Sequence, residues 1–88
     1  MKKLLNTLYI TSENKYLSLD GENVVIKEEG AELGRMPLHN LEMIVTFSRA
    51  GASPALMGKC ADNNISIVFL TPSGSFLARV EGKTKGNV

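Results

Sequence analysis

Residues 41–70, LEMIVTFSRAGASPALMGKCADNNISIVFL, decide the fold class of this 88-residue chain. The stretch opens with a β-prone segment over 41–47 and ends with the most hydrophobic run of the chain, 65–70. The residues between these two segments have the signals of a helix. A strand–helix–strand order follows, and the connection is long enough for a right-handed crossover between two parallel strands of one sheet.

The helix is expected over about residues 53–63. Ser53 is a good N-cap, and Pro54 suits the first helical position, where its missing N–H costs nothing. Leu56 and Cys60 follow at helical spacing, and a polar run ends the segment.

The two flanking strands differ in how we expect them to be buried. Alternate residues of the first strand share a face that must be buried: Leu41, Met43, Val45 and Phe47. Ile44 leaves the opposite face partly apolar, so something partly covers that face too. The run 65–70 is expected to be a central strand that is buried on both faces.

A hairpin and an edge strand are expected before this stretch. Asp20-Gly21 separates the β-prone runs 16–19 and 23–26, which predicts a tight hairpin, because glycine tolerates the positive φ of such turns. Glu28-Glu29-Gly30 supplies another turn, which leads to a weaker, edge-like strand over 31–36.

Strands over 4–11 and 75–81 complete the inventory. The fold class is therefore α+β and mainly β, with about seven short strands in two small packed sheets and one helix. We expect one domain over residues 1–81, because a chain of this length builds a single core. The polar tail GKTKGNV, residues 82–88, is typical of the start of a linker to a further domain.

Composition excludes several classes of protein. The net charge of +1 argues against a dedicated nucleic-acid-binding module, which carries a basic stripe. The single cysteine excludes an internal disulfide and a multi-cysteine zinc site. Asn6 and Thr7 interrupt the apolar region that a signal peptide needs, and no run reaches the about 18 apolar residues of a membrane helix. We expect a soluble protein of the cytoplasm.

Two residues are candidates for chemistry, His39 and Cys60. No second histidine or converging carboxylate stands near His39 at a ligand spacing, so we interpret it as a turn histidine hydrogen-bonded to the backbone. Cys60 lies in the expected helix, and we interpret it as a small buried hydrophobe. The residues thus supply no catalytic, metal-binding or cofactor-binding site, and a small enzyme that uses Cys60 or His39 stays open as an alternative.

Charged and aromatic residues are weaker candidates for binding. We interpret Glu28-Glu29 as residues that solvate a loop and discourage edge pairing. Gly51-Ala52-Ser53-Pro54 could hold an anion at the helix N-terminus, but a turn followed by a cap is the more common role. Tyr9 and Tyr16 could stack on unpaired bases, although ordinary strand packing is the more common role.

Basic side chains could contact phosphates if the fold gathers them, and solvated surface lysines are the alternative. The residues concerned are Lys2, Lys3, Arg49, Arg79, Lys83 and Lys85. None of them is assigned to nucleic acid from the sequence.

The residues alone therefore predict a non-catalytic scaffold. It is either an assembly domain of a larger enzyme or a free-standing adaptor. An adaptor would bind a peptide or protein by sheet-edge pairing along a strand such as 31–36.

Three stretches of the chain, in this order and spacing, carry a resemblance to a known family. The first is NTLYIT (6–11) with YLSLDGENVV (16–25); the second is PLHNLE (37–42) with IVTF (44–47) and GASPALM (51–57); the third is ISIVFLTPSG (65–74) with FLARV (76–80). Together they resemble the N-terminal β-domain of the CRISPR-associated spacer-acquisition integrase, in its subtype I-C form. The resemblance covers nearly the whole chain and includes ordinary residues as well as glycines.

This resemblance implies an activity and a set of partners. Members of the family are metal-dependent DNA endonucleases and integrases that insert foreign DNA spacers into a CRISPR array, with Mg or Mn as the divalent metal. Their β-domain joins a larger helical domain that carries the metal-binding Glu, His and acidic residue, so none of these falls on this chain and His39 does not match the catalytic histidine. A homodimer, a small companion subunit and double-stranded DNA are the implied partners. We therefore expect a dimerisation and scaffold domain whose chemistry lies in another part of the protein.

Overall fold

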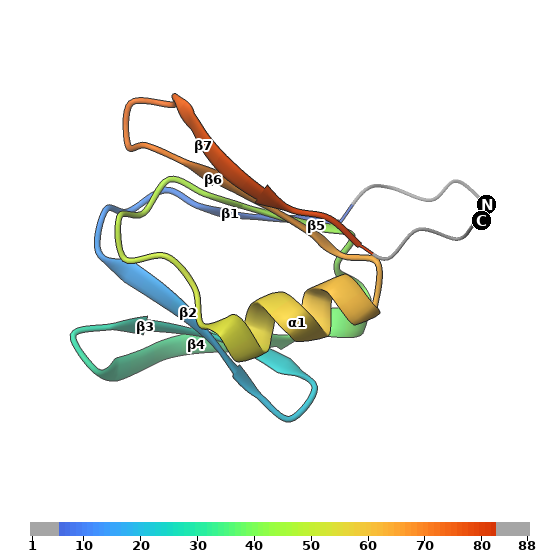
Figure 1. Ribbon diagram of the computed structural model, residues 1–88. Coiled ribbons are helices and arrows are strands. Elements are labelled where there is room, and N and C mark those ends of the chain that lie inside the picture. Colours follow the sequence, from blue (N-terminus) through green and yellow to red (C-terminus); the bar gives the residue numbers. More distant parts are fainter. Residues whose placement is uncertain (1–5, 83–88) are drawn as a thin grey trace.

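The computed structural model describes residues 6–82, which form seven short strands, a 3₁₀ turn and one α-helix (Figure 1). In chain order the elements are β1 (Thr7–Ile10), β2 (Lys15–Asp20), β3 (Asn23–Glu28), β4 (Ala31–Pro37), η1 (Leu38–Asn40), β5 (Met43–Thr46), α1 (Pro54–Asp62), β6 (Ser66–Leu70) and β7 (Phe76–Val80). The predicted order of strands and helix is confirmed, and so is the fold class.

The strands form two sheets. Sheet A has the strand order β1-β5-β6-β7, in which β1, β5 and β6 are parallel and β7 is antiparallel to β6. Sheet B is the antiparallel meander β2-β3-β4. Because α1 connects the parallel neighbours β5 and β6, the predicted strand–helix–strand crossover is confirmed.

Local signals in the sequence place the first hairpin and the helix. Gly21 has a φ of 62° in the turn between β2 and β3, which is the positive φ that Asp20-Gly21 predicts. Ser53 caps α1, because its hydroxyl oxygen accepts a hydrogen bond from the Leu56 N–H at 3.1 Å. The helix begins at Pro54 as predicted.

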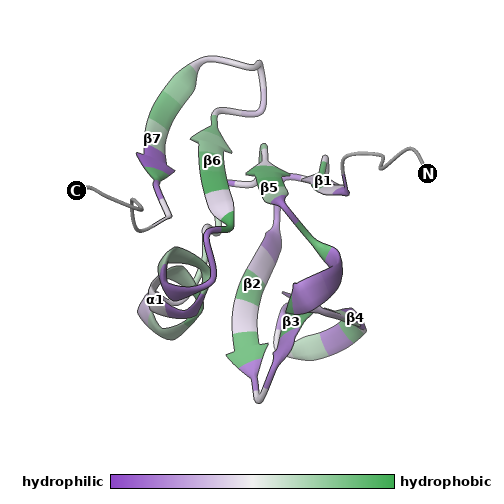
Figure 2. Ribbon diagram, turned by 90° about the vertical axis from the view of Figure 1, so that its right-hand side faces the viewer, coloured by the Kyte–Doolittle hydropathy of each residue, from purple (hydrophilic) through white to green (hydrophobic). Residues whose placement is uncertain are grey.

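The core lies between the two sheets and beside α1. Figure 2 shows α1 and sheet B on the same side of sheet A. Side chains with no exposed surface come from β2, β5, α1 and β6: Leu17, Ile44, Leu56 and Ile67. The side of sheet A that they share is called the inner face below.

Backbone hydrogen bonds hold β2 to the entrance of α1. The Leu17 N–H donates to the Gly51 carbonyl oxygen at 3.0 Å, and the Ser53 N–H donates to the Leu17 carbonyl oxygen at 2.8 Å. Leu17 therefore joins sheet B to the segment between β5 and α1 through its backbone, while its side chain fills the core.

The prediction of which face of β5 is buried is wrong. Ile44 and Thr46, on the opposite face, have no exposed surface. Of the four residues predicted to be buried, only Leu41 is buried. The other three are partly exposed: Met43, Val45 and Phe47. The physical reason is that α1 and sheet B both lie on the Ile44 side, and no described element covers the Val45 side (Figure 2).

The same arrangement corrects the prediction for residues 65–70. β6 is central in sheet A, between β5 and β7, as expected. Ile65 and Ile67 are buried, but Val68 and Leu70 are only partly buried. The strand is therefore buried on one face and not on both.

A polar network closes the turn after β5. Thr46 has no exposed surface and Ser48 is 4% exposed. The Ser48 N–H donates to Thr46 Oγ1 at 3.1 Å, and the Ser48 hydroxyl donates to the Glu13 carbonyl oxygen at 2.9 Å. Ser48 Oγ also accepts from the Ala50 N–H at 3.1 Å. The network joins this turn to the loop between β1 and β2.

The described chain ends in close contact with the loop after α1. A Cβ atom built on Gly82 would stand 2.5 Å from the Asn64 Cα atom, so the approach requires glycine. Apart from Gly82, the predicted linker over 82–88 lies outside the described residues, as do residues 4 and 5 of the predicted first strand. Within residues 6–82, no helix has the length and apolar character needed to cross a membrane.

Candidate interaction surface

The uncovered side of sheet A, called the outer face, is a continuous row of paired residues. Tyr9 on β1 pairs with Val45 on β5, Val45 pairs with Val68 on β6, and Val68 pairs with Arg79 on β7. Directly paired residues project from the same side of a sheet, so these four side chains share the outer face. Met43, Leu70 and Phe76 extend this face along the strands.

Large apolar side chains are exposed on and beside the outer face. Tyr9 is 62% exposed and Phe76 is 64% exposed. Figure 2 shows β5 and β6 coloured as hydrophobic strands in the middle of the sheet. An apolar surface of this kind, which no described element covers, is typical of a surface that binds another protein.

The β7 edge has an irregularity that exposes another leucine. The register shifts between Phe69 and Leu70, so Leu77 has no partner on β6. Leu77 is 61% exposed. A bulge of this kind twists an edge strand and disfavours the addition of a further strand.

The outer face carries little charge. Arg79 is its cation, and Arg79 Nε lies 2.8 Å from Glu81 Oε2. The ion pair neutralises the guanidinium, so the face as a whole is apolar and close to neutral.

Sheet B has the opposite character. Arg35 on β4 binds Glu32 through two hydrogen bonds at 2.8 and 2.9 Å, and its Nη1 atom lies 3.0 Å from Asp20 Oδ2 on β2. The hydrogen bond from Arg35 lowers the pKa of the Glu32 carboxyl. Val25, the strand partner of Arg35, is 2% exposed beneath this polar arrangement. The solvent side of sheet B is therefore charged, unlike that of sheet A.

The prediction that residues 31–36 form an edge strand is confirmed, since β4 is the last strand of sheet B. A register shift between Ile26 and Lys27 leaves Leu33 of β4 without a partner, and Leu33 is 54% exposed. This bulge weakens the case for strand addition at β4, which the adaptor alternative requires.

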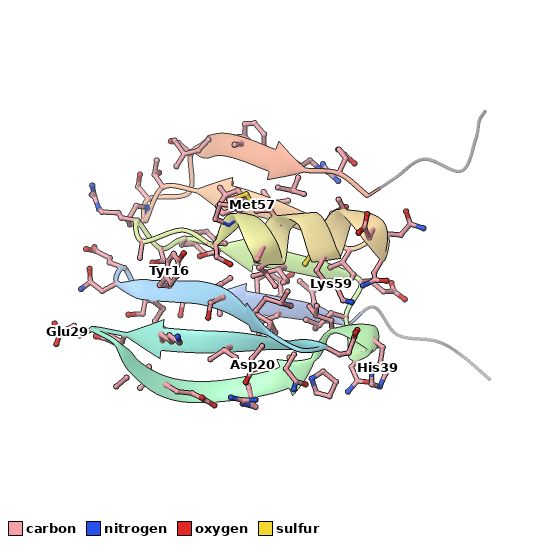
Figure 3. All side chains as sticks on the ribbon, turned by 60° about the horizontal axis from the view of Figure 1, so that its bottom comes forward. Tyr16, Asp20, Glu29, His39, Met57 and Lys59 are labelled. Atoms are coloured by element: carbon pink, nitrogen blue, oxygen red, sulfur yellow. The ribbon has the colours of Figure 1, made fainter. Side chains whose placement is uncertain are left out.

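His39 lies away from both sheet faces, at the end of the domain opposite Glu29 (Figure 3). It is exposed on η1 at the rim of a cavity of about 270 Å³ that Glu22 and Asn63 also line. The hydrogen bond of this imidazole to the backbone stays a prediction, since none is found among residues 6–82. The backbone of the turn is satisfied without it, since the Leu41 N–H donates to the Leu38 carbonyl oxygen at 2.8 Å.

Cys60 is a buried core residue, as predicted, with no exposed surface. Burial raises the pKa of its thiol to about 11. We expect iodoacetamide to label Cys60 at least about tenfold more slowly in the folded protein at about pH 8 than in concentrated urea, because the thiolate is the reactive form. Mass spectrometry of the labelled fraction over time measures the ratio, and equal rates in the two conditions would contradict the burial of the thiol.

The remaining residues that the sequence offered for ligand binding lie apart from one another or already form hydrogen bonds within the protein. Glu28 Oε1 accepts a hydrogen bond from Lys15 Nζ at 3.3 Å, and Ser53 Oγ is occupied by its capping bond. Tyr16 is 37% exposed on sheet B and Tyr9 is 62% exposed on sheet A, so the two tyrosines belong to different sheets.

The described residues form no basic patch. Residues 6–82 contain six Lys or Arg and nine Asp or Glu residues, so this part of the chain is net acidic. Arg49 is exposed near the entrance of α1, Arg79 is paired with Glu81, and the other basic candidates lie outside the described residues: Lys2, Lys3, Lys83 and Lys85.

The sequence did not predict that one face of sheet A is an exposed apolar surface. The apolar residues of 41–47 and 65–70 were visible, but both runs are apolar on both sides. Only the pairing of β1 with β5 and the position of α1 decide which side stays uncovered.

Comparison with known proteins identifies relatives of this fold and sequence. A family model described as CRISPR associated protein Cas1 matches residues 8–88. Over 88 residues, the chain is 51% identical to the CRISPR-associated endonuclease Cas1 2 of Rhodospirillum rubrum and 46% identical to the CRISPR-associated endonuclease Cas1 1 of Chlorobaculum tepidum. These alignments cover 100% of this chain and 26% of each relative, so the chain spans about a quarter of their length.

A solved structure has the same fold. A chain of a Cas6-RT-Cas1--Cas2 complex superimposes with a TM-score of 0.82 and 12% sequence identity, and the match covers 94% of this chain and 9% of that chain. At this identity the likeness concerns the fold alone.

Proposed function

The chain belongs to the CRISPR associated protein Cas1 family, and from this premise we propose that it is the N-terminal dimerisation and scaffold domain of a CRISPR adaptation integrase. The observation that carries the proposal is the family match across residues 8–88 in a chain that spans about a quarter of its relatives. In this proposal, residues 1–81 are the β-domain and residues 82–88 begin a linker to a helical domain.

The proposal places the chemistry in the longer protein. That protein is a metal-dependent DNA endonuclease and integrase that inserts foreign DNA spacers into a CRISPR array, with Mg or Mn as its metal. The residues present here do not fit such a metal, because residues 6–82 contain no group of three His, Cys, Asp or Glu side chains that could hold an ion. No catalytic step is therefore assigned to this domain.

The proposed partners are a second copy of the chain, Cas2 and double-stranded DNA, all in the cytoplasm. The likeness in fold to a chain of a complex that contains Cas2 supports Cas2 as a partner. DNA binding is assigned to the longer protein, because the described residues are net acidic and DNA affinity depends on basic contacts to phosphates.

A nuclease assay tests the proposal. The purified 88-residue chain and the longer protein encoded by the same gene are incubated with double-stranded DNA, with Mg, with Mn and with a chelator. We expect no cleavage by the short chain under any condition, and metal-dependent cleavage by the longer protein. Metal-stimulated cleavage by the short chain at a rate comparable to that of the longer protein would overturn the assignment of a scaffold role.

The gene gives an independent check. We expect the reading frame to continue past codon 88 into a helical region that contains separated Glu, His and acidic residues. A stop codon directly after Val88 would instead favour the adaptor alternative.

A further inference from the structure

We infer that the cleft between β1 and β4 binds an extended apolar segment of another protein, which adds to sheet A as a further strand. The inference goes beyond the proposed function, because a dimerisation and scaffold role requires no peptide site. It names β1, rather than the bulged strand β4, as the edge that the segment joins.

The space between the two sheets is closed on one side and open on the other. α1 contacts β2 and β6 and closes one side (Figure 2). On the opposite side, β1 and β4 are the edge strands of their sheets, and cavities of about 490 and 260 Å³ lie between them. Leu8 of β1 lines both cavities, Met36 of β4 lines the larger, and Leu33 and Gly34 line the smaller. The core is therefore open along β1.

β1 is the regular edge among the described strands. β4 and β7 each have a bulge, and β2 is occupied at Leu17 by its bridge to Ala52. β1 pairs with β5 without a register shift, and no strand within residues 6–82 pairs with its other side. A regular, unpaired edge is a template for the backbone of another strand.

The backbone groups of β1 that face the cleft can be identified from its bonds to β5. The carbonyl oxygens of Asn6 and Ile10 accept from the N–H groups of Glu42 and Phe47, both at or beside β5. Backbone groups of successive residues in a strand point to alternate edges, so those of Thr7 and Tyr9 point away from β5. They supply two donors and two acceptors for an added strand.

The walls of the cleft are apolar and leave room for a side chain. Partly or fully exposed apolar residues line it: Leu8, Ile26, Leu33 and Met36. Gly34 pairs with Ile26 on β3, and a Cβ atom built on Gly34 would meet no atom within 4 Å. A side chain of the added segment fits where Gly34 has none.

This combination of groups selects an extended polypeptide as the occupant. A lipid would cover the apolar walls but leave the backbone groups of Thr7 and Tyr9 unpaired. A nucleic acid requires cations, and the cation that lines the smaller cavity, Lys15, lies 3.3 Å from Glu28 Oε1. A second copy would have to bring an edge of its own. Its regular edge is another β1, which β4 flanks, so one segment suits the cleft better than a folded sheet.

NMR titration of the 88-residue chain with a model peptide tests the inference. The probe is a heptapeptide of alternating valine and threonine, with blocked ends and a lysine at each end for solubility. We expect a dissociation constant below about 1 mM, with shifts of the Thr7 and Tyr9 N–H signals and of the Leu8 and Leu33 methyl signals, and none at Leu77. A peptide with serine in place of each valine should bind at least about tenfold more weakly.

Two variants separate the two parts of the contact. Gly34→Val fills the cleft without a clash, and we expect it to raise the dissociation constant at least about tenfold while the circular dichroism spectrum is unchanged. Tyr9→Pro removes an N–H that points away from β5, and proline is tolerated in edge strands. We expect a similar rise for Tyr9→Pro and a change within about twofold for its control Tyr9→Thr, which loses the same ring but keeps the N–H.

Each outcome decides for or against the inference. The absence of shifts at Thr7 and Tyr9 up to about 5 mM peptide overturns it, and so does binding that Gly34→Val and Tyr9→Pro both leave unchanged. Shifts of the same signals on concentrating the protein without peptide would place a second copy in the cleft instead. Binding to the 88-residue chain but not to the longer protein would place a segment of the longer protein there. The nuclease assay of the proposed function is independent of all these results.

Discussion

Leu17→Ala is expected to lower the free energy of unfolding by about 3–5 kcal/mol, because the change removes a fully buried side chain and leaves a cavity in the core. A domain of this size has about 5–10 kcal/mol of stability in total, so the variant should be close to unfolded. The effect is large because Leu17 packs where sheet B meets sheet A and α1. Urea denaturation followed by circular dichroism measures the loss.

Leu33→Ala is the matched control for this prediction. It removes the same atoms from a side chain that is 54% exposed on β4, so we expect a change within about 0.5 kcal/mol. Equal losses in the two variants would contradict the position of the core between the sheets.

Ser48→Ala is expected to lower the free energy of unfolding by about 1–3 kcal/mol. The hydroxyl donates to the Glu13 carbonyl oxygen and accepts from the Ala50 N–H, and the residue is 4% exposed. Without the hydroxyl, two partly buried hydrogen bonds are lost, the one that Ser48 donates and the one that it accepts from the Ala50 N–H. The Glu13 carbonyl oxygen keeps one partner, since it also accepts from the Arg49 N–H at 2.9 Å.

The control for Ser48→Ala is Ser73→Ala, in the exposed turn between β6 and β7. The Ser73 hydroxyl lies 3.1 Å from Thr71 Oγ1 and is open to solvent, so water replaces the lost bond. We expect a change within about 0.5 kcal/mol in the same denaturation measurement. If Ser73→Ala lowered the free energy of unfolding as much as Ser48→Ala does, burial would not explain the energetic cost of losing these hydroxyl groups.

Local features of the fold could be predicted from the sequence, because they depend on residues that are neighbours in the chain. The Asp20-Gly21 turn and the Ser53 cap both lie where local conformational preferences place them. The meander over β2, β3 and β4 follows from two such turns.

The sequence could not predict which side of the central strands β5 and β6 is buried, because both sides of each strand carry apolar residues. Residues 41–47 offer Ile44 on one side and Val45 on the other, and hydrophobicity does not separate them. The choice depends on α1 and sheet B, which both pack on the Ile44 side. The register shifts at Leu33 and Leu77 are equally invisible in the sequence, since each depends on how one strand pairs with the next.

The outer face of sheet A could not be predicted from the sequence, because it depends on which strands pair. Tyr9 and Arg79 are separated by most of the chain and meet in one row only through β5 and β6. In contrast, Cys60 was assigned correctly, because its position at helical spacing from Leu56 already places it on the buried side of α1.

The pairing of β1 with β5 has a consequence for how the chain folds. Thr7 pairs with Met43, and the whole of sheet B lies between them in the sequence. Contacts within the β2-β3-β4 meander are local and form fast, whereas a parallel pair with a long intervening segment forms slowly. A meander that forms early shortens the effective loop between β1 and β5, which reduces the entropy lost when the two strands meet. We therefore expect early formation of sheet B to favour the pairing of β1 with β5.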